Sequence, residues 1–173
     1  ADNFELRKDW DSIWSVLKND KVMQYKNNQP AFTGTDFLTA ITLLNNYKLW
    51  LAEKRGSVSC KKKDVLRLQY EEYIEHKDAL IEGLNEAIKF IKEQCIYTSV
   101  DLPYTSQIIP LAVTFAIDKN LWFNAKNKAK LTQWYWCGVF GELYGGANET
   151  RYVTDVQGLA RWAQNDNDLP DTV

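Results

Sequence analysis

The stretch 131–146, LTQWYWCGVFGELYGG, decides the fold that we expect for this chain of 173 residues. If it is a helix of about 3.6 residues per turn, apolar groups lie on both of its sides. One side carries Leu131, Trp134, Tyr135, Gly138 and Gly141, and the other carries Trp136, Val139, Phe140 and Leu143. A helix that is apolar all round is buried in a protein or in a membrane, and a membrane span needs about 20 apolar residues. Because lysines precede this stretch and cut it short, we expect the central helix of a bundle.

Polar residues near this stretch form a candidate charge network. Gly138 and Gly141 predict that another backbone packs closely against the central helix, and Glu142 lies on the same side. A buried carboxylate is costly unless it is paired. Arg151 and Asp155, four residues apart, share one face of the following helix. Because an arginine satisfies buried carboxylates well, we favour a structural network of Glu142, Arg151 and Asp155. An acidic site or a phosphate contact is the functional alternative.

The composition is that of one globular domain with an aromatic-rich core. Hydrophobic residues make up 45% of the chain and charged residues 25%, with seven tryptophans and nine tyrosines. The formal net charge of −2 offers no general attraction to nucleic acid. Two local basic patches remain, at 61–63 and at Lys126, Lys128 and Lys130. Clustered lysines are more often a solvated face, and we keep the second patch as the alternative, a candidate nucleic-acid contact.

The residue types present limit the chemistry. His76 is the only histidine, so a His-rich zinc site or an H-N-H nuclease centre cannot be built, and its charged surroundings predict an exposed position. Cys60, Cys95 and Cys137 are odd in number and far apart, which argues against a disulfide framework and for a reducing compartment; we expect Cys137 to be buried. No Gly-rich phosphate loop follows a strand. We therefore predict no catalytic residue, no metal and no cofactor in this chain.

Apolar side chains at helical spacing predict an all-α, single-domain bundle of about six helices. The expected ranges are 6–19, 36–54, 70–96, 105–119, 131–146 and 149–164, with a short helix at 61–68. Thr35 or Asp36 is the expected N-cap of the helix at 36–54, and Gly56 is expected to end that helix. Ser59 is the expected N-cap of the short helix at 61–68. Gly83 favours a close packing contact or is a tolerated surface glycine, whereas Pro110 predicts a kink. No alternating apolar run indicates a strand.

We expect a cytoplasmic protein without a signal peptide or a transmembrane span. The chain begins ADNFELRKDW and ends DNDLPDTV, and both ends look like cuts in a longer protein. Residues 1–173 are thus expected to be one helical domain of a longer multidomain protein.

Four segments resemble one known family. They are DFLTAITLL (36–44), SCKKKDVL (59–66), DLPYTSQIIPLAV (101–113) and KLTQWYWCGVFGELYGGANETRYVTDVQGL (130–159). Together they resemble the GmrS-like family, the ParB-related domain found in GmrSD-type restriction systems that act in prokaryotic phage defence. The likeness covers residues 37–162. Its most specific part is W-Y-W-C-x-x-F-x-E-x-Y-G followed by E-T-R and Asp155.

The resemblance implies a supporting role. In that family a ParB-like α/β unit carries a D-G-Q-Q-R motif tied to nucleotide hydrolysis, a helical portion follows, and many members end in an H-N-H nuclease. This sequence has no D-G-Q-Q-R, so it resembles the helical portion alone and no catalytic residue carries over. The implied partners are the rest of the parent protein and DNA, and NTP and Mg²⁺ would belong to that parent.

The alternative is a non-catalytic protein–protein interaction module. A large exposed apolar patch without a nearby basic groove would favour this module. A basic groove lined by Lys126, Lys128, Lys130 and Arg151 would favour the supporting domain instead.

Overall fold

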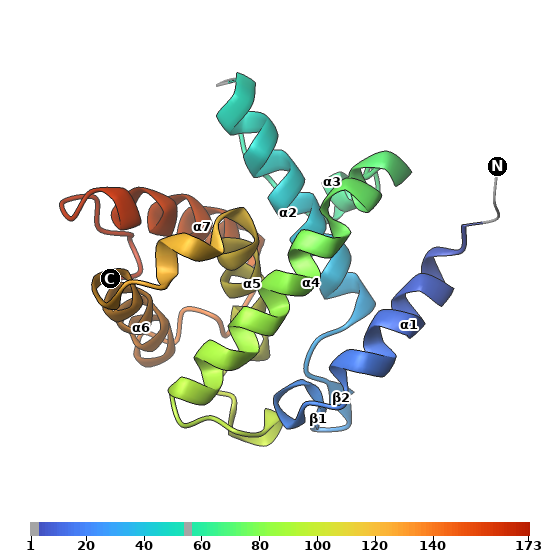
Figure 1. The fold of residues 1–173 in the computed structure, drawn as a ribbon, viewed down its shortest axis with the longest axis horizontal. Helices are drawn as coiled ribbons and strands as arrows, with labels where there is room; N and C mark the ends of the chain where they lie inside the picture. The colour runs from blue at the N-terminus through green and yellow to red at the C-terminus, as the bar shows by residue number, and fades with distance from the viewer. Residues whose placement is uncertain (1–3, 54–56) are drawn as a thin grey trace.

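The computed structural model describes residues 4–53 and 57–173 and confirms the all-α prediction (Figure 1). In this part of the chain seven α-helices hold more than half of all residues. They are α1 (Leu6–Leu17), α2 (Gly34–Glu53), α3 (Lys62–Val65), α4 (Tyr70–Glu93), α5 (Ile108–Ile117), α6 (Ala125–Phe140) and α7 (Glu149–Gln164). Four 3₁₀ turns lie between them: η1 (Lys21–Met23), η2 (Ser99–Asp101), η3 (Thr105–Gln107) and η4 (Lys119–Trp122). None of the described helices is both long enough and apolar enough to cross a bilayer.

The polar segment after α1 contains a small hairpin that the sequence pattern did not predict. Its strands β1 (Tyr25–Lys26) and β2 (Gln29–Pro30) are antiparallel and two residues long. Asn27 and Asn28 between them have φ values of 51° and 63°, a left-handed backbone that asparagine tolerates and that a tight type I′ turn requires. The Ser99 hydroxyl donates to the Tyr25 carbonyl at 2.8 Å, which holds the hairpin against η2.

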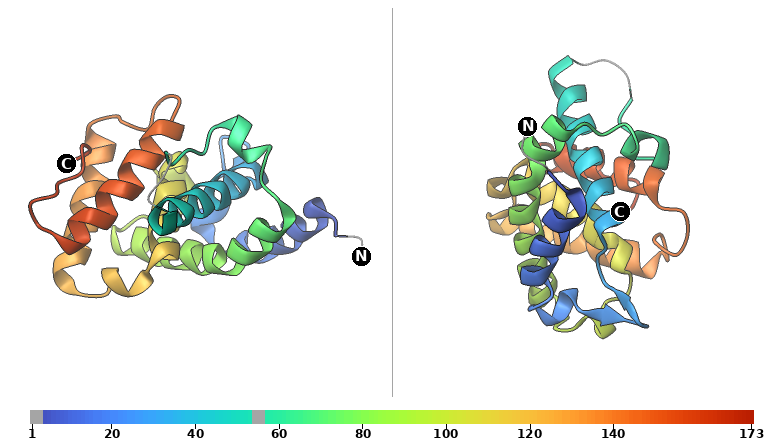
Figure 2. Two further views of the ribbon diagram at one scale, coloured as in Figure 1. Left: turned by 90° about the horizontal axis from the view of Figure 1, so that it is seen from above. Right: turned by 90° about the vertical axis from the view of Figure 1, so that its right-hand side faces the viewer.

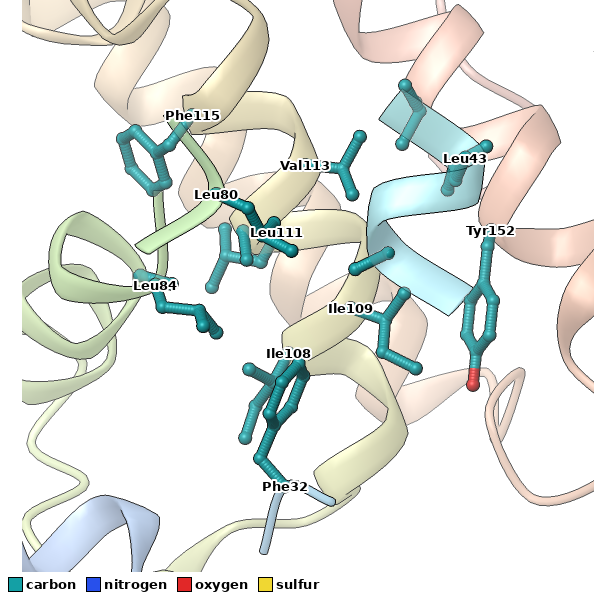
Figure 3. Packing of buried hydrophobic residues seen from close by; sticks show 14 of the residues in the cluster. Phe32, Leu43, Leu80, Leu84, Ile108, Ile109, Leu111, Val113, Phe115 and Tyr152 are labelled. Atoms are coloured by element: carbon teal, nitrogen blue, oxygen red, sulfur yellow. The ribbon is translucent and has the colours of Figure 1, made fainter. Parts of the chain in front are cut away.

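The central helix of the bundle is α5, which corrects the prediction for 131–146. All eight residues from Ile108 to Phe115 are buried, and α5 contacts α4, α2 and α7. Figure 3 shows side chains of these helices, among them Leu84, Leu43 and Tyr152, gathered around it. The helix is ten residues long and almost wholly apolar, so it can be covered on every side.

The predicted central stretch lies at the side of the bundle instead. Helix α6 ends at Phe140, whose side chain is 79% exposed, and Trp136 is only half-buried. Figures 1 and 2 show α6 and α7 together at one end of the molecule, with α1 at the other. The prediction that 131–146 is the central helix was wrong because the surface of a folded protein retains much apolar area, and the second apolar side of α6 partly faces solvent.

The prediction of close backbone packing is correct at Gly83 and wrong at Gly138 and Gly141. A Cβ atom on Gly83 would lie 2.3 Å from the Ala112 carbonyl oxygen, so α4 and α5 touch backbone to backbone and the close contact is confirmed. A Cβ on Gly138 would instead meet side chains, with Gln107 Nε2 at 2.8 Å, and Gly141 is exposed. Among the described residues, none of the three atoms nearest to either Cβ position belongs to the backbone of another helix.

The helix ends also revise details. Thr33, not Thr35 or Asp36, caps α2: its hydroxyl accepts from the Asp36 N–H at 3.1 Å, and its own N–H donates to Asp36 at 2.8 Å. The cap position of α3 is Lys61, not Ser59. Pro110 lies in the first turn of α5, where its missing N–H has no helical partner to lose, so the predicted kink has no cause. The expected end of α2 at 54–56 lies outside the described residues.

Candidate functional site

A buried carboxylate, Asp155 on α7, is the centre of the polar network. Its side chain is 0% exposed, and one oxygen accepts from the Tyr144 hydroxyl while the other accepts from the Thr172 hydroxyl. Arg151 donates to the oxygen of Thr172 at 3.3 Å. Asp155 therefore joins three parts of the chain: the segment after α6, helix α7 and the C-terminal segment.

Hydroxyl donors, rather than an ion pair, stabilise this carboxylate. Burial raises the pKa of Asp155, and the bonds from Thr172 and Tyr144, together with the Arg151 charge, act in the opposite direction. Burial and the neighbouring carboxylate also raise the pKa of Tyr144 well above its usual range, so its hydroxyl keeps the proton that it donates. Among the described residues, no cation lies within 4.0 Å of Asp155.

Glu142 lies outside this network, which corrects one of its three predicted members. Its side chain is exposed, and its φ of 53° is left-handed because the helix has already ended at Phe140. The backbone turn directs the chain so that Tyr144, two residues later, is buried in its place. The sequence analysis did not predict Tyr144 or Thr172 as members of this network. Tyr144 is the last tyrosine of the aromatic motif, which was a signal for it, whereas no sequence pattern indicated Thr172.

The three lysines proposed as nucleic-acid contacts are paired with carboxylates. Lys126 and Lys130 both contact Asp166, the second at 2.7 Å, and Lys128 contacts Glu93 at 2.7 Å. Lys130 is 7% exposed and donates to the Trp162 carbonyl in the last turn of α7. A cation at this position satisfies a helix carbonyl and the negative end of the helix dipole. Lys126 and Lys130 thus join α6 to the end of α7, whereas Lys128 joins α6 to the end of α4.

His76 is buried, contrary to the prediction of an exposed position. It is 2% exposed, and its Nε2 lies 3.1 Å from Asn45 Oδ1, whose amide nitrogen donates to Glu72 at 3.1 Å. Burial and the Lys48 charge lower the pKa of His76, against smaller opposing effects of two glutamates, Glu75 and Glu72. Its spacing from Tyr73 and Leu80 was the missed signal, because steps of three and four residues continue the core stripe.

The three cysteines are free thiols in different surroundings. Cys60 is buried and its thiol donates to the Glu149 carbonyl at 3.6 Å. Burial, helped by two nearby carboxylates, raises its pKa to about 12, which makes it a poor nucleophile. Cys95 is exposed, and Cys137 is half-buried rather than buried as predicted.

Two of the surface cavities are distinguished by their lining. The aromatic groove, of about 340 Å³, lies between α1, α2 and α4 and is lined by Leu6, Arg7, Trp10, Phe37, Leu38 and Tyr73. The polar groove, of about 390 Å³, lies between α2 and the segment around α3 and is lined by Asn46, Trp50, Glu53, Lys61, Lys63 and Asp64. An adjoining space of about 140 Å³ shares Asn46 and Asp64 and adds Asn45, Arg67 and Glu72. In the described part of the chain, no three His, Cys, Asp or Glu side chains are grouped to hold a metal.

Comparison with known proteins gives a similarity over part of the chain. No family model and no solved structure matches the chain. It is similar to an uncharacterized protein of Methanocaldococcus jannaschii, with 31% identity over 71 residues. The match covers 41% of this chain and 11% of that protein, so the chain spans about a tenth of the relative's length.

Proposed function

We propose that this chain is a non-catalytic helical interaction module within a longer protein, the hypothesis that an apolar groove favours when Lys126, Lys128 and Lys130 are paired with carboxylates. The parent that we propose for it is a GmrS-like defence protein. In this proposal the chain packs against a ParB-like unit of a cytoplasmic parent. Nucleotide hydrolysis with Mg²⁺, and cleavage of DNA, belong to that unit and to an H-N-H nuclease domain. The similarity to a much longer protein supports a place within a larger chain.

The observation that carries the proposal is the aromatic groove. Phe4 and Tyr70 extend its apolar surface, with ring centroids 4.8 Å apart, and they are 39% and 51% exposed. Phe37 and Tyr73 form the floor at 6.2 Å between centroids and are buried. A continuous aromatic surface that runs from the core to solvent is the usual setting for a protein–protein contact.

Helix α1 forms one wall of this groove and leaves part of its own apolar face exposed. Leu17 is its only buried residue, whereas Trp10, Ile13 and Trp14 are half-buried. Asp9 anchors the wall to α4 by accepting from the Tyr73 hydroxyl at 2.6 Å and from Lys77 at 3.1 Å. The wall is therefore held against α4, while the exposed part of its apolar face is available to a partner.

The groove fits an amphipathic helix of the parent protein that brings apolar side chains and a carboxylate. Arg7 on the rim is exposed, and no carboxylate of the described residues lies within 4.0 Å of it. An acidic residue of the partner would pair with Arg7 at the edge, where charges set orientation and rate of association. Apolar anchors at helical spacing would fill the space over Phe37 and Tyr73.

The test is binding between this chain and the remainder of its parent, produced as two separate proteins and measured by calorimetry. Leu6→Glu places a charge in the groove and is expected to weaken binding at least tenfold. Val16→Glu is the matched control on the same helix, because Val16 is 69% exposed and lies outside the groove lining. Equal affinities for both variants, or no binding by the unaltered chain, would refute the proposal.

A further inference from the structure

We propose that the tip of α2, residues 48–53, binds the surface of an anionic lipid bilayer and places its apolar side chains at the level of the headgroups. The aromatic groove uses the other end of this helix, where Phe37 and Leu38 line it. The membrane contact is therefore independent of the proposed function.

The tip of α2 extends beyond the helices that bury the rest of α2. Every residue from Ala40 to Asn45 is buried, and so is Tyr47. Residues 48–53 are exposed, apart from the half-buried Trp50. Figures 1 and 2 show this end of α2 standing out from the bundle. It is therefore accessible to an extended surface.

Apolar side chains surround the tip. Residues 49–52 read Leu-Trp-Leu-Ala, so steps of about 100° per residue distribute them around the helix. Leu49 and Leu51 are 46% and 47% exposed. A run of exposed apolar residues is unfavourable in water unless it serves a contact. Because this run surrounds the helix, it fits a medium that encloses the tip better than a partner that covers one face.

Cations lie beside the tip and outnumber the carboxylates. Lys61 and Lys63 line the polar groove together with Trp50, which places them next to the tip. The described residues from 48 to 68 contain five cations and two carboxylates: Lys48, Lys61, Lys62, Lys63 and Arg67, against Glu53 and Asp64. Glu72, in the adjoining space, is a third carboxylate, whereas the sequence 54–56, KRG, adds two cations. This end is therefore positive in a chain whose net charge is −2.

An anionic lipid surface matches both features. The headgroup region of a bilayer accommodates leucine and tryptophan side chains, and anionic lipids attract the neighbouring lysines. A nucleic acid would attract the same lysines, but its phosphates offer no apolar surroundings for Leu49 and Leu51. The membrane therefore accounts for more of this surface. A contact of this kind needs no membrane-spanning helix.

The test is flotation of the whole chain with lipid vesicles at low ionic strength. Vesicles of phosphatidylserine and phosphatidylcholine in equal amounts are expected to bind it at least tenfold more tightly than vesicles of phosphatidylcholine alone, and added salt should weaken this binding. Brominated lipid chains should quench indole fluorescence, and Trp50→Phe should remove most of that quenching. The proposal is overturned if the two kinds of vesicle bind equally, if neither binds, or if the quenching survives Trp50→Phe.

Apolar variants locate the inserted side chains. Leu49→Ser/Leu51→Ser is expected to weaken binding to the anionic vesicles at least fivefold. Val16→Ser/Leu169→Ser is the matched control, because these side chains are 69% and 58% exposed outside the tip, and it should leave binding unchanged. Far-ultraviolet dichroism checks that every variant is folded. Equal effects of the two double variants would contradict insertion of the tip.

Lysine variants locate the electrostatic part of the contact. Lys61→Ala/Lys63→Ala is expected to weaken vesicle binding at least fivefold. Lys126→Ala/Lys128→Ala makes the same change in net charge at lysines of α6 and should have little effect. A short single-stranded oligonucleotide tests the other anion. If it binds through Lys61 and Lys63 while the vesicles do not bind, the surface serves nucleic acid and the membrane proposal is wrong.

Discussion

The Tyr144 hydroxyl donates a hydrogen bond to the Asp155 carboxylate, and both side chains are buried at the contact between the segment after α6 and helix α7. The second carboxylate oxygen accepts from Thr172, so one side chain closes three segments of the chain. Because two hydroxyl groups take the place of an ion pair, we expect the loss of either donor to lower the free energy of unfolding. Two predictions follow from this arrangement.

Tyr144→Phe removes one of these donors and keeps the ring. Hydrogen bonds to charged groups contribute about 1.5–3 kcal/mol, so we expect the free energy of unfolding to fall by about 2 kcal/mol. Urea unfolding monitored by dichroism measures the change. Tyr97→Phe, at a residue that is 58% exposed, is the control and should change little. A loss of equal size in both variants would show that the Asp155 bond does not stabilise the fold.

Asp155 predicts a specific dependence of stability on pH. Burial raises its pKa above the value of 3.8 that applies when the chain is unfolded. The folded protein therefore holds the proton more tightly, and ionising this group lowers the free energy of unfolding as the pH rises above 3.8. Asp155→Asn cannot ionise, so its stability relative to the unaltered chain should improve with rising pH. Denaturant unfolding of both proteins from pH 4 to pH 8 measures this difference, and a constant difference would contradict the raised pKa.

Gly83→Ala tests the contact between α4 and α5. Alanine favours a helix over glycine by about 1 kcal/mol, but overpacking costs about 1–3 kcal/mol. Because the new methyl group would lie 2.3 Å from the Ala112 carbonyl oxygen, the clash should dominate and the variant should lose stability. A Cβ on Gly146 would meet nothing within 4 Å, so Gly146→Ala should be neutral. Thermal melts of both variants measure the difference in stability. A Gly83→Ala variant as stable as the original would show that the two helices separate without cost.

Lys130→Met tests the lysine cluster as a structural element. The ammonium group of Lys130 bonds the Trp162 carbonyl, and a cation at a helix C-terminus contributes about 0.3–1 kcal/mol, or up to 2 kcal/mol when partly buried. We expect a loss of about 1 kcal/mol or more in urea unfolding. Lys126→Met, at an exposed lysine, should change stability much less. If both variants lost the same stability, the hydrogen bond from Lys130 to the Trp162 carbonyl would not stabilise the fold.

The helical stripes were predictable because side-chain spacing reports local geometry. The observed bounds of α1 and α4 lie within three residues of the expected ones, and those of α7 coincide with them. Which helix is central was not predictable, because α5 and α6 are both apolar on several sides and only tertiary packing decides between them. Thr172 lies 17 residues from Asp155 in an irregular segment, so no periodicity connects the two.

His76 gives the last prediction, an acid-dependent loss of stability. Its pKa in the folded protein is lowered from 6.5, mainly because burial disfavours the imidazolium, with a further effect of Lys48. Below pH 6.5 the unfolded chain therefore binds a proton that the folded chain resists, and the free energy of unfolding falls as the pH drops through this region. His76→Gln keeps a hydrogen-bonding side chain without titrating, so its stability should vary less between pH 7.5 and pH 5. Urea unfolding at both pH values compares the two proteins, and His76 would have to be assigned an ordinary, solvent-like pKa if their changes were the same.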